Sequence, residues 1–176
     1  MLLKKILLLG TISASIAFTA CDNDDEDAVL DNLNQVDREF VTNASMNNMA
    51  EISLGELAQS NSSNDSVRNY GSMMVTEHNM AQDELDSLAS KLNADQPDSL
   101  NSSMKELRDR LAGYTGYDFD TAYINSQISA HNMAITQFEN QINNGSNTSI
   151  RSYANKYLPK IRMHKTMADS VKTTLD

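Results

Sequence analysis

The sequence predicts an all-α protein, built as a four-helix bundle with a long crossover that contains a short helix. Apolar residues recur at helical spacing from about Val36 to the end of the chain. The 176 residues include only six glycines and two prolines, too few turn-forming residues for a many-stranded sandwich or barrel. No repeat and no change of composition divides this region, so one domain is expected over residues 37–176.

The first two helices are expected to form an antiparallel hairpin. The first covers residues 37–62, and the second begins after a cap at Asn64 or Asp65. Because only a short turn separates them, they must run in opposite directions. Their apolar faces are Phe40, Ala44, Leu54 and Ala58 in the first helix, and Val67, Tyr70, Met74, Ala81, Leu85, Leu88 and Leu92 in the second.

The crossover is expected over residues 93–117. Pro97 keeps its first part out of a helix. A capping-box pattern from Ser103 to Glu106 then opens a short amphipathic helix, which ends at Gly113.

The third long helix is expected over residues 118–144, with Gly145 as its stop, and the fourth begins near Thr148. Two short turns and one long crossover then join the four helices, which is the ferritin-like connectivity rather than a simple up-and-down one. Their apolar faces are Phe119, Tyr123, Ile124, Ala134, Phe138 and Ile142 in the third helix, and Ile150, Ala154, Tyr157, Ile161, Ala168, Val171 and Leu175 in the fourth.

Residues 1–20 have the pattern of a signal peptide. Two lysines precede an apolar run of about 13 residues, short of the ~20 that a membrane-spanning helix needs. Phe18 to Ala20 lead into Cys21, the only cysteine, and resemble a bacterial lipobox with phenylalanine in place of the commoner leucine. The resemblance implies cleavage before Cys21, acylation of this residue, and the membrane as a partner through the lipid anchor. A plain secretory signal and an uncleaved anchor stay open as alternatives.

The segment 21–36 is expected to be an acidic tether, because its like charges keep it extended. Without the two lysines of the signal peptide, 12 basic residues face 24 acidic ones, a net charge of -12. This balance excludes nucleic acid as a partner, since phosphate binding needs basic side chains. The expected location is the cell envelope, as an outer membrane lipoprotein facing the periplasm or the cell surface. The acids of the tether are Asp22, Asp24, Asp25, Glu26 and Asp27.

Titratable side chains interrupt the apolar face of each long helix once. Glu51, His78, His131 and His164 stand there, and the last three are all the histidines of the chain. Counted from the turn of each hairpin, they lie roughly 18, 22, 21 and 28 Å along the bundle at ~1.5 Å per residue. Three imidazoles and one carboxylate at similar heights predict ligands for zinc, iron or copper. The residues expected to surround them are Glu77, Asp120, Tyr123, Gln127 and Tyr157.

A polar core without metal is the alternative. Inward histidines can hydrogen-bond to buried partners, and each unsatisfied group costs about 1–3 kcal/mol, so stability alone can retain such a network. A ferritin-type di-iron centre is disfavoured, because it needs Glu-x-x-His pairs and the residues three before the histidines are Val75, Ile128 and Ile161. A copper site would add thioether ligands. The methionines near the histidines are Met74, Met133, Met163 and Met167.

The same positions resemble the domain of unknown function 4142 family, a group of exported bacterial proteins. The resemblance spans residues 37–171 and rests on Phe40, Ala44, Glu51–Ile52, Met74–His78, Phe119–Asp120, Tyr123, His131, Leu158–Pro159 and His164. It implies a ferritin-like bundle in the cell envelope and no established activity. Asparagine- and serine-rich helices depart from the alanine- and lysine-rich helices of many members. The recurrent polar residues that the resemblance implies are Glu51, His78, Asp120, Tyr123, His131 and His164.

Two functions stay open for this sequence. One is a lipid-anchored envelope protein that binds a transition metal inside the bundle. The other is a non-enzymatic interaction or envelope-maintenance module, in which the inward histidines and Glu51 only stabilise the core. The sequence has no Gly-x-Ser-x-Gly motif, no phosphate-binding loop and no cysteine besides Cys21, so an enzyme is the less favoured class. Protein partners and oligomeric state do not follow from the sequence.

Overall fold

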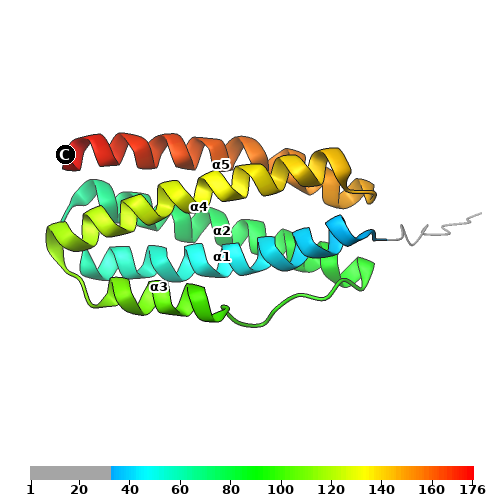
Figure 1. Ribbon diagram of the computed structural model, residues 1–176, viewed down its shortest axis with the longest axis horizontal. Coiled ribbons are helices and arrows are strands. Elements are labelled where there is room, and N and C mark those ends of the chain that lie inside the picture. Colours follow the sequence, from blue (N-terminus) through cyan, green and yellow to red (C-terminus); the bar gives the residue numbers. More distant parts are fainter. Residues whose placement is uncertain (1–32) are drawn as a thin grey trace, which may run out of the picture.

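The computed structural model describes residues 33–176 and contains five α-helices in this part of the chain. Figure 1 shows the four long helices side by side as a bundle, with the short helix lying along its outside. The predicted all-α four-helix bundle with a short helix in the crossover is therefore confirmed. The helices are α1 (Gln35–Asn61), α2 (Asp65–Leu92), α3 (Ser102–Ala112), α4 (Gly116–Asn144) and α5 (Thr148–Leu175).

Two hairpins make up the bundle. One consists of α1 and α2, the other of α4 and α5, and contacts of α1 with α4 and of α2 with α5 bring them together. The predicted signal peptide, Cys21 and the acidic run after it lie outside the described residues. Between residues 33 and 176, no helix has both the length and the apolar character needed to cross a membrane.

Asparagine side chains begin four of the five helices. Asn34, Asn64, Asn101 and Asn147 each accept a hydrogen bond from a backbone N–H in the first turn, which satisfies a donor that has no partner inside the helix. The cap of α3 differs from the prediction at Ser103. Asn101 Oδ1 takes this place, because it accepts from the backbone N–H of Met104 at 2.9 Å and from the Ser103 hydroxyl at 2.8 Å.

A buried carboxylate ties the start of α1 to the turn between α4 and α5. Asp37 Oδ2 accepts from the backbone N–H groups of Ser146 and Asn147 at 3.1 Å each, and Oδ1 accepts from Gln141 Nε2 at 2.6 Å. Burial alone would raise the pKa of Asp37, but these hydrogen bonds outweigh it and hold the pKa below its usual value. Asp37 thereby fastens the second hairpin to the first at one end of the bundle.

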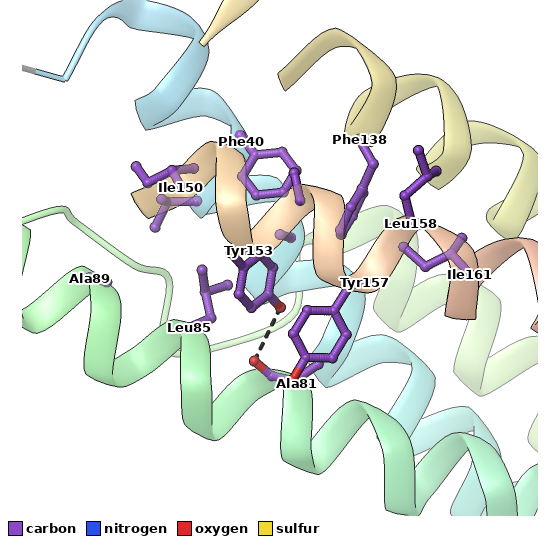
Figure 2. Packing of buried hydrophobic residues seen from close by; sticks show 13 residues of the cluster. Phe40, Ala81, Leu85, Ala89, Phe138, Ile150, Tyr153, Tyr157, Leu158 and Ile161 are labelled. Carbon is purple, nitrogen blue, oxygen red and sulfur yellow. Dashed lines mark hydrogen bonds between the residues drawn. The ribbon is translucent and has the colours of Figure 1, made fainter. Parts of the chain in front are cut away.

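The interior consists of two apolar clusters, one toward each end of the bundle. Figure 2 shows the first cluster, where the Tyr153 hydroxyl donates to the Ala81 carbonyl at 3.1 Å. The second cluster is centred on Tyr70, Met74, Phe119 and Tyr123. Most of the predicted apolar faces are fully buried. Only the following members are partly exposed: Leu88, Leu92, Ala134, Ile142, Val171 and Leu175.

Two glycines set the closest approach of α1 and α2. A Cβ atom on Gly71 would lie 2.7 Å from the Ala58 Cβ and 2.8 Å from the Gly55 carbonyl oxygen. A Cβ on Gly55 would lie 2.6 Å from the Gly71 carbonyl oxygen. The backbones of the first hairpin therefore touch directly at this point, in a way that only glycine permits.

Candidate metal centre

A polar layer separates the two apolar clusters and contains all three histidines. Each long helix contributes one of the titratable residues predicted above, and this residue lies between residues of the first cluster and residues of the second. They are Glu51, His78, His131 and His164. His78, His131 and His164 are 8%, 2% and 2% exposed, so the layer is closed to solvent. The three ring centroids lie 5.4 to 6.1 Å apart, and one ligand atom of each ring lies within 4.8 Å of the other two. The structure thus brings together three histidines that come from three helices.

The tautomer of His131 is fixed by its own helix. Its Nδ1 lies 2.9 Å from the backbone carbonyl oxygen of Gln127, one turn earlier in α4. A carbonyl oxygen can only accept, so Nδ1 carries the proton and donates it. In the neutral ring, the lone pair is then on Nε2, the nitrogen that is free to bind a metal ion.

A chain of side-chain amides fixes the tautomer of His78. Gln82 Nε2 donates to the Asp86 carboxylate at 2.6 Å, and Gln82 Oε1 accepts from Asn48 Nδ2 at 3.1 Å. Asn48 Oδ1 then faces His78 Nδ1 at 2.9 Å. Because a carboxylate only accepts, it orients both amides, and His78 must donate from Nδ1. The lone pair of neutral His78 is therefore also on Nε2.

Sequence reasoning missed Asn48 and Gln82. A signal for Asn48 was present, because it lies four residues after Ala44 and three before Glu51, on the buried face of the first helix. Its exposed fraction is 5%. Gln82 is only partly buried, and nothing in its spacing marks it as a partner of Asn48.

Several ring nitrogens are buried without a hydrogen-bond partner. Within the described residues, these are Nε2 of His78, Nε2 of His131 and both nitrogens of His164. His164 Nε2 does lie 3.3 Å from the Glu77 carboxylate, without hydrogen-bond geometry. A polar core whose histidines were tied to neighbouring side chains would leave no such set of nitrogens, since each unsatisfied group costs about 1–3 kcal/mol.

The histidine environment favours neutral rings. Burial lowers the pKa of His78 well below its usual value, and the nearby His164 and His131 lower it further. Burial and His131 lower the pKa of His164 to about 4, although the Glu77 carboxylate acts in the opposite direction. Neutral imidazoles at neutral pH have the lone pairs that metal ligation requires.

Glu51 lies beside this cluster rather than inside it. Its Oε1 is 4.0 Å from His131 Nδ1, the nitrogen whose proton already goes to the Gln127 carbonyl. Burial raises the pKa of the Glu51 carboxyl, while His131 and the Gln127 side chain lower it. Glu51 is not among the mutually close ligand atoms of the three histidines.

The predicted surrounding residues divide into two groups. Glu77 and Gln127 contact the histidines, through a carboxylate beside His164 and a backbone carbonyl on His131. Tyr157 borders the cluster, but its hydroxyl donates to Glu84 at 2.8 Å. Tyr123 is stacked on the Phe119 ring in the second apolar cluster, and Asp120 is buried, with an Oδ1 that has no hydrogen-bond partner among the described residues.

The methionines do not supply thioether ligands as the copper interpretation expects. Met133, Met163 and Met167 are 66%, 42% and 39% exposed, so they point away from the buried layer. Met74 packs in the second apolar cluster. Methionine here fills the core or covers the surface, as it does in most helical proteins.

The cluster fits a single metal ion with small movements. Metal–nitrogen bonds of about 2.0–2.1 Å place two ligands of a tetrahedral ion about 3.3 Å apart. Since the three nitrogens lie within 4.8 Å of one another, each ring has to shift inward by less than about 1 Å. A larger hollow of about 430 Å³ nearer one end of the bundle is lined by none of the histidines.

Two small cavities border the cluster. One of about 30 Å³ lies between α1 and α4, and one of about 10 Å³ lies between α2 and α5. A water molecule needs roughly 10–15 Å³. Each cavity is therefore about the size of one or two water molecules.

The tautomers can be checked before any metal is added. In nitrogen-15 NMR spectra of metal-free protein at pH 7, His78 and His131 are expected to carry their proton on Nδ1. Asn48→Leu removes the acceptor of His78, so its proton is expected to redistribute between the two nitrogens while His131 stays unchanged. Asn43→Leu, an exposed change on the same helix, is the control. A proton on Nε2 of His78 in the wild type would contradict the amide chain.

Comparisons with known proteins agree with the fold. Residues 24–171 match the model of a family described as "Domain of unknown function (DUF4142)", as the sequence predicted. No curated protein matches the chain. The fold is similar to that of a DUF305 fragment from Deinococcus radiodurans, with a TM-score of 0.72 and 9% identity over 81% of this chain and 98% of that one. A DUF305 protein from Streptomyces coelicolor has a TM-score of 0.69 and 7% identity over 80% of this chain and 92% of its own. At such identities the likeness concerns the fold alone.

Proposed function

We propose that this chain, which belongs to the DUF4142 family, binds one transition-metal ion through His78, His131 and His164. One observation carries the proposal. Three buried rings from three helices lie close together, and each ring has at least one buried nitrogen without a hydrogen-bond partner among the described residues. In His78 and His131, a hydrogen bond at Nδ1 fixes the ring and leaves Nε2 for the metal. Proteins commonly orient histidine ligands in this way.

The donor set defines the class of metal. Imidazole suits zinc, copper, iron and nickel, whereas magnesium and calcium prefer oxygen ligands. Three histidines leave at least one coordination position for another ligand, as in zinc sites with an exchangeable position. We infer that the protein binds a single ion of zinc, iron or copper. The alternative is a module in which the histidines only stabilise the core.

A metal titration of untagged, metal-free protein tests this function. The wild type is expected to take up one equivalent of zinc or copper, and its melting temperature to rise by about 5–10 °C at a free metal concentration near 100 times Kd. His131→Ala is expected to lose this shift. Met133→Leu is a matched control on the same helix, because its side chain is exposed. A wild type that neither takes up metal nor shifts would leave the core-stabilising module as the function.

We also propose that the protein is an envelope lipoprotein anchored through Cys21. The sole cysteine after a short apolar run supports this proposal. Cys21→Ser is expected to release the domain in soluble form or to leave it with an uncleaved signal peptide. Membrane fractionation with mass spectrometry of the N-terminus checks the outcome. Detergent-resistant attachment of a wild type with unmodified Cys21 would rule out lipidation.

A further inference from the structure

Glu77 connects the buried histidines with the surface. It precedes His78 in α2, yet its side chain reaches toward α5. There, Oε2 lies 3.3 Å from His164 Nε2 and 3.3 Å from Lys160 Nζ. Side-chain exposure rises along this path, from 3% for His164 to 20% for Glu77 and 40% for Lys160. One carboxylate is thus shared by a buried imidazole and a solvated ammonium.

The small cavity between α2 and α5 follows the same path. Its wall includes Glu77 and Lys160 as well as His78 and His164. The cavity between α1 and α4 includes Glu51 but has no lysine or arginine in its wall. Of these two cavities, only the one beside Glu77 therefore offers a cation a charged, partly solvated approach to the histidines.

We propose that Glu77 is the fourth protein ligand of the ion, that the ion enters between α2 and α5, and that Lys160 pairs with Glu77 until the ion replaces it. This inference rests on the proposed function and refines it. It assigns to Glu77 the ligand role that the sequence predicted for Glu51.

Distances decide between the two carboxylates. An oxygen and a nitrogen on one tetrahedral ion, at bonds of about 2.0–2.2 Å, lie about 3.4 Å apart. Glu77 Oε2 and His164 Nε2 are 3.3 Å apart, so an ion can bridge this pair. Like Glu51, Glu77 is not among the mutually close ligand atoms of the three histidines, so its side chain has to move toward His78 and His131 when the ion binds. Glu51 lies 4.0 Å from a His131 nitrogen that keeps its proton, and an ion cannot bridge that pair.

Charge favours the exchange of Lys160 for a metal ion. The Lys160–Glu77 pair is partly solvated, so water can replace each partner and breaking the pair costs little. A divalent ion held by three neutral rings would bring two uncompensated charges into the core, and one carboxylate ligand halves that charge. Lys160 keeps a second contact, because its ammonium already lies 5.8 Å from the centroid of the Tyr157 ring.

Cobalt(II) and zinc titrations of four proteins test the inference. Glu77→Gln keeps the shape of the side chain and removes its charge, so we expect affinity to fall roughly 10–100-fold, with a changed d–d spectrum of bound cobalt. Glu51→Gln is the matched control, with an affinity within about threefold of the wild type. Lys160→Met is expected to speed cobalt uptake in stopped-flow measurements, because the carboxylate is then free from the start.

The outcomes separate the two proposals. If the wild type binds cobalt and Glu77→Gln matches it in affinity and spectrum, Glu77 is not a ligand while the three-histidine site stands. If Glu51→Gln loses affinity instead, Glu51 is the ligand. If the wild type binds no cobalt or zinc at all, both proposals fall together. Unchanged uptake by Lys160→Met would contradict the entry path. The melting temperature of each metal-free variant confirms that it is folded.

Discussion

Metal-free protein is expected to lose stability as the pH falls from 7 to 4.5. Burial lowers the pKa of His78 well below its usual value and that of His164 to about 4, whereas both have a pKa near 6.5 in the unfolded chain. At pH values between the folded and the unfolded pKa, the unfolded chain binds more protons than the folded protein. The free energy of unfolding therefore decreases as the pH falls. His164 alone accounts for roughly 2–3 kcal/mol at pH 4.5.

Three carboxyl groups limit the useful pH window. Burial raises the pKa of Glu51, so this group favours the folded state as pH falls, opposite to the histidines. Asp37 and Glu84 have lowered pKa values, because their hydrogen bonds outweigh burial, and their stabilisation is lost as pH falls below about 4.5. Measurements between pH 7 and 4.5 therefore report mainly on the histidines, with Glu51 opposing them.

Denaturant unfolding of a triple variant checks this prediction. His78, His131 and His164 are all replaced by glutamine, which keeps a polar side chain in the layer. The free energy of unfolding is expected to become flat between pH 7 and 4.5, or to rise slightly toward low pH because Glu51 remains. A triple variant that keeps the wild-type pH profile would show that the histidines are not buried in neutral form, and the metal site would lose its basis.

Gly71→Ala is expected to destabilise the fold by about 2 kcal/mol or more, and to lower the melting temperature by about 5–10 °C. The new methyl group meets the Gly55 carbonyl oxygen at 2.8 Å, and a backbone atom cannot rotate away. Alanine favours helix over glycine by up to about 1 kcal/mol, which offsets only part of this cost. The helices must separate, and apolar contacts along the whole hairpin weaken.

Gly113→Ala is the matched control for this change. Gly113 ends α3 with a φ of -79°, and a Cβ there would lie 3.4 Å from the Arg110 carbonyl oxygen. We expect no loss of stability, and a gain of up to about 1 kcal/mol from a less flexible unfolded chain. Thermal unfolding of both variants separates the close contact from a general effect of replacing glycine. Equal melting temperatures for Gly71→Ala and the wild type would contradict the close approach of α1 and α2.

The fold could be predicted because each of its signals is local. Helical spacing of apolar residues gave the four long helices, and the stops at Gly113 and Gly145 agree with the observed helix ends. The contact between Gly55 and Gly71 was not predicted, because sequence periodicity does not give the distance between two helices. The cap at Asn101 was also missed, since Ser103 and Glu106 matched a capping box two residues later.

The candidate site could be predicted in part, because residue spacing is also a local signal. Spacing gives the face and height of a side chain, and this suffices to place His78, His131 and His164 in one layer. It does not give side-chain torsions, and those decide which carboxylate reaches the cluster. Glu51 lies on the buried face of α1, but beside His131 Nδ1, which carries a proton. Glu77 is partly exposed, and its side chain reaches across to His164 in α5.

The metal content of untagged protein tests the three-histidine site most directly. The full chain is expressed with its own signal peptide, purified without a His tag, and analysed by elemental mass spectrometry beside His131→Ala. The predicted result is about one ion of zinc, iron or copper per wild-type chain, and little or none in the variant. Wild-type protein with far less than one ion per chain, and with no thermal shift when these metals are added, would contradict a metal-binding function.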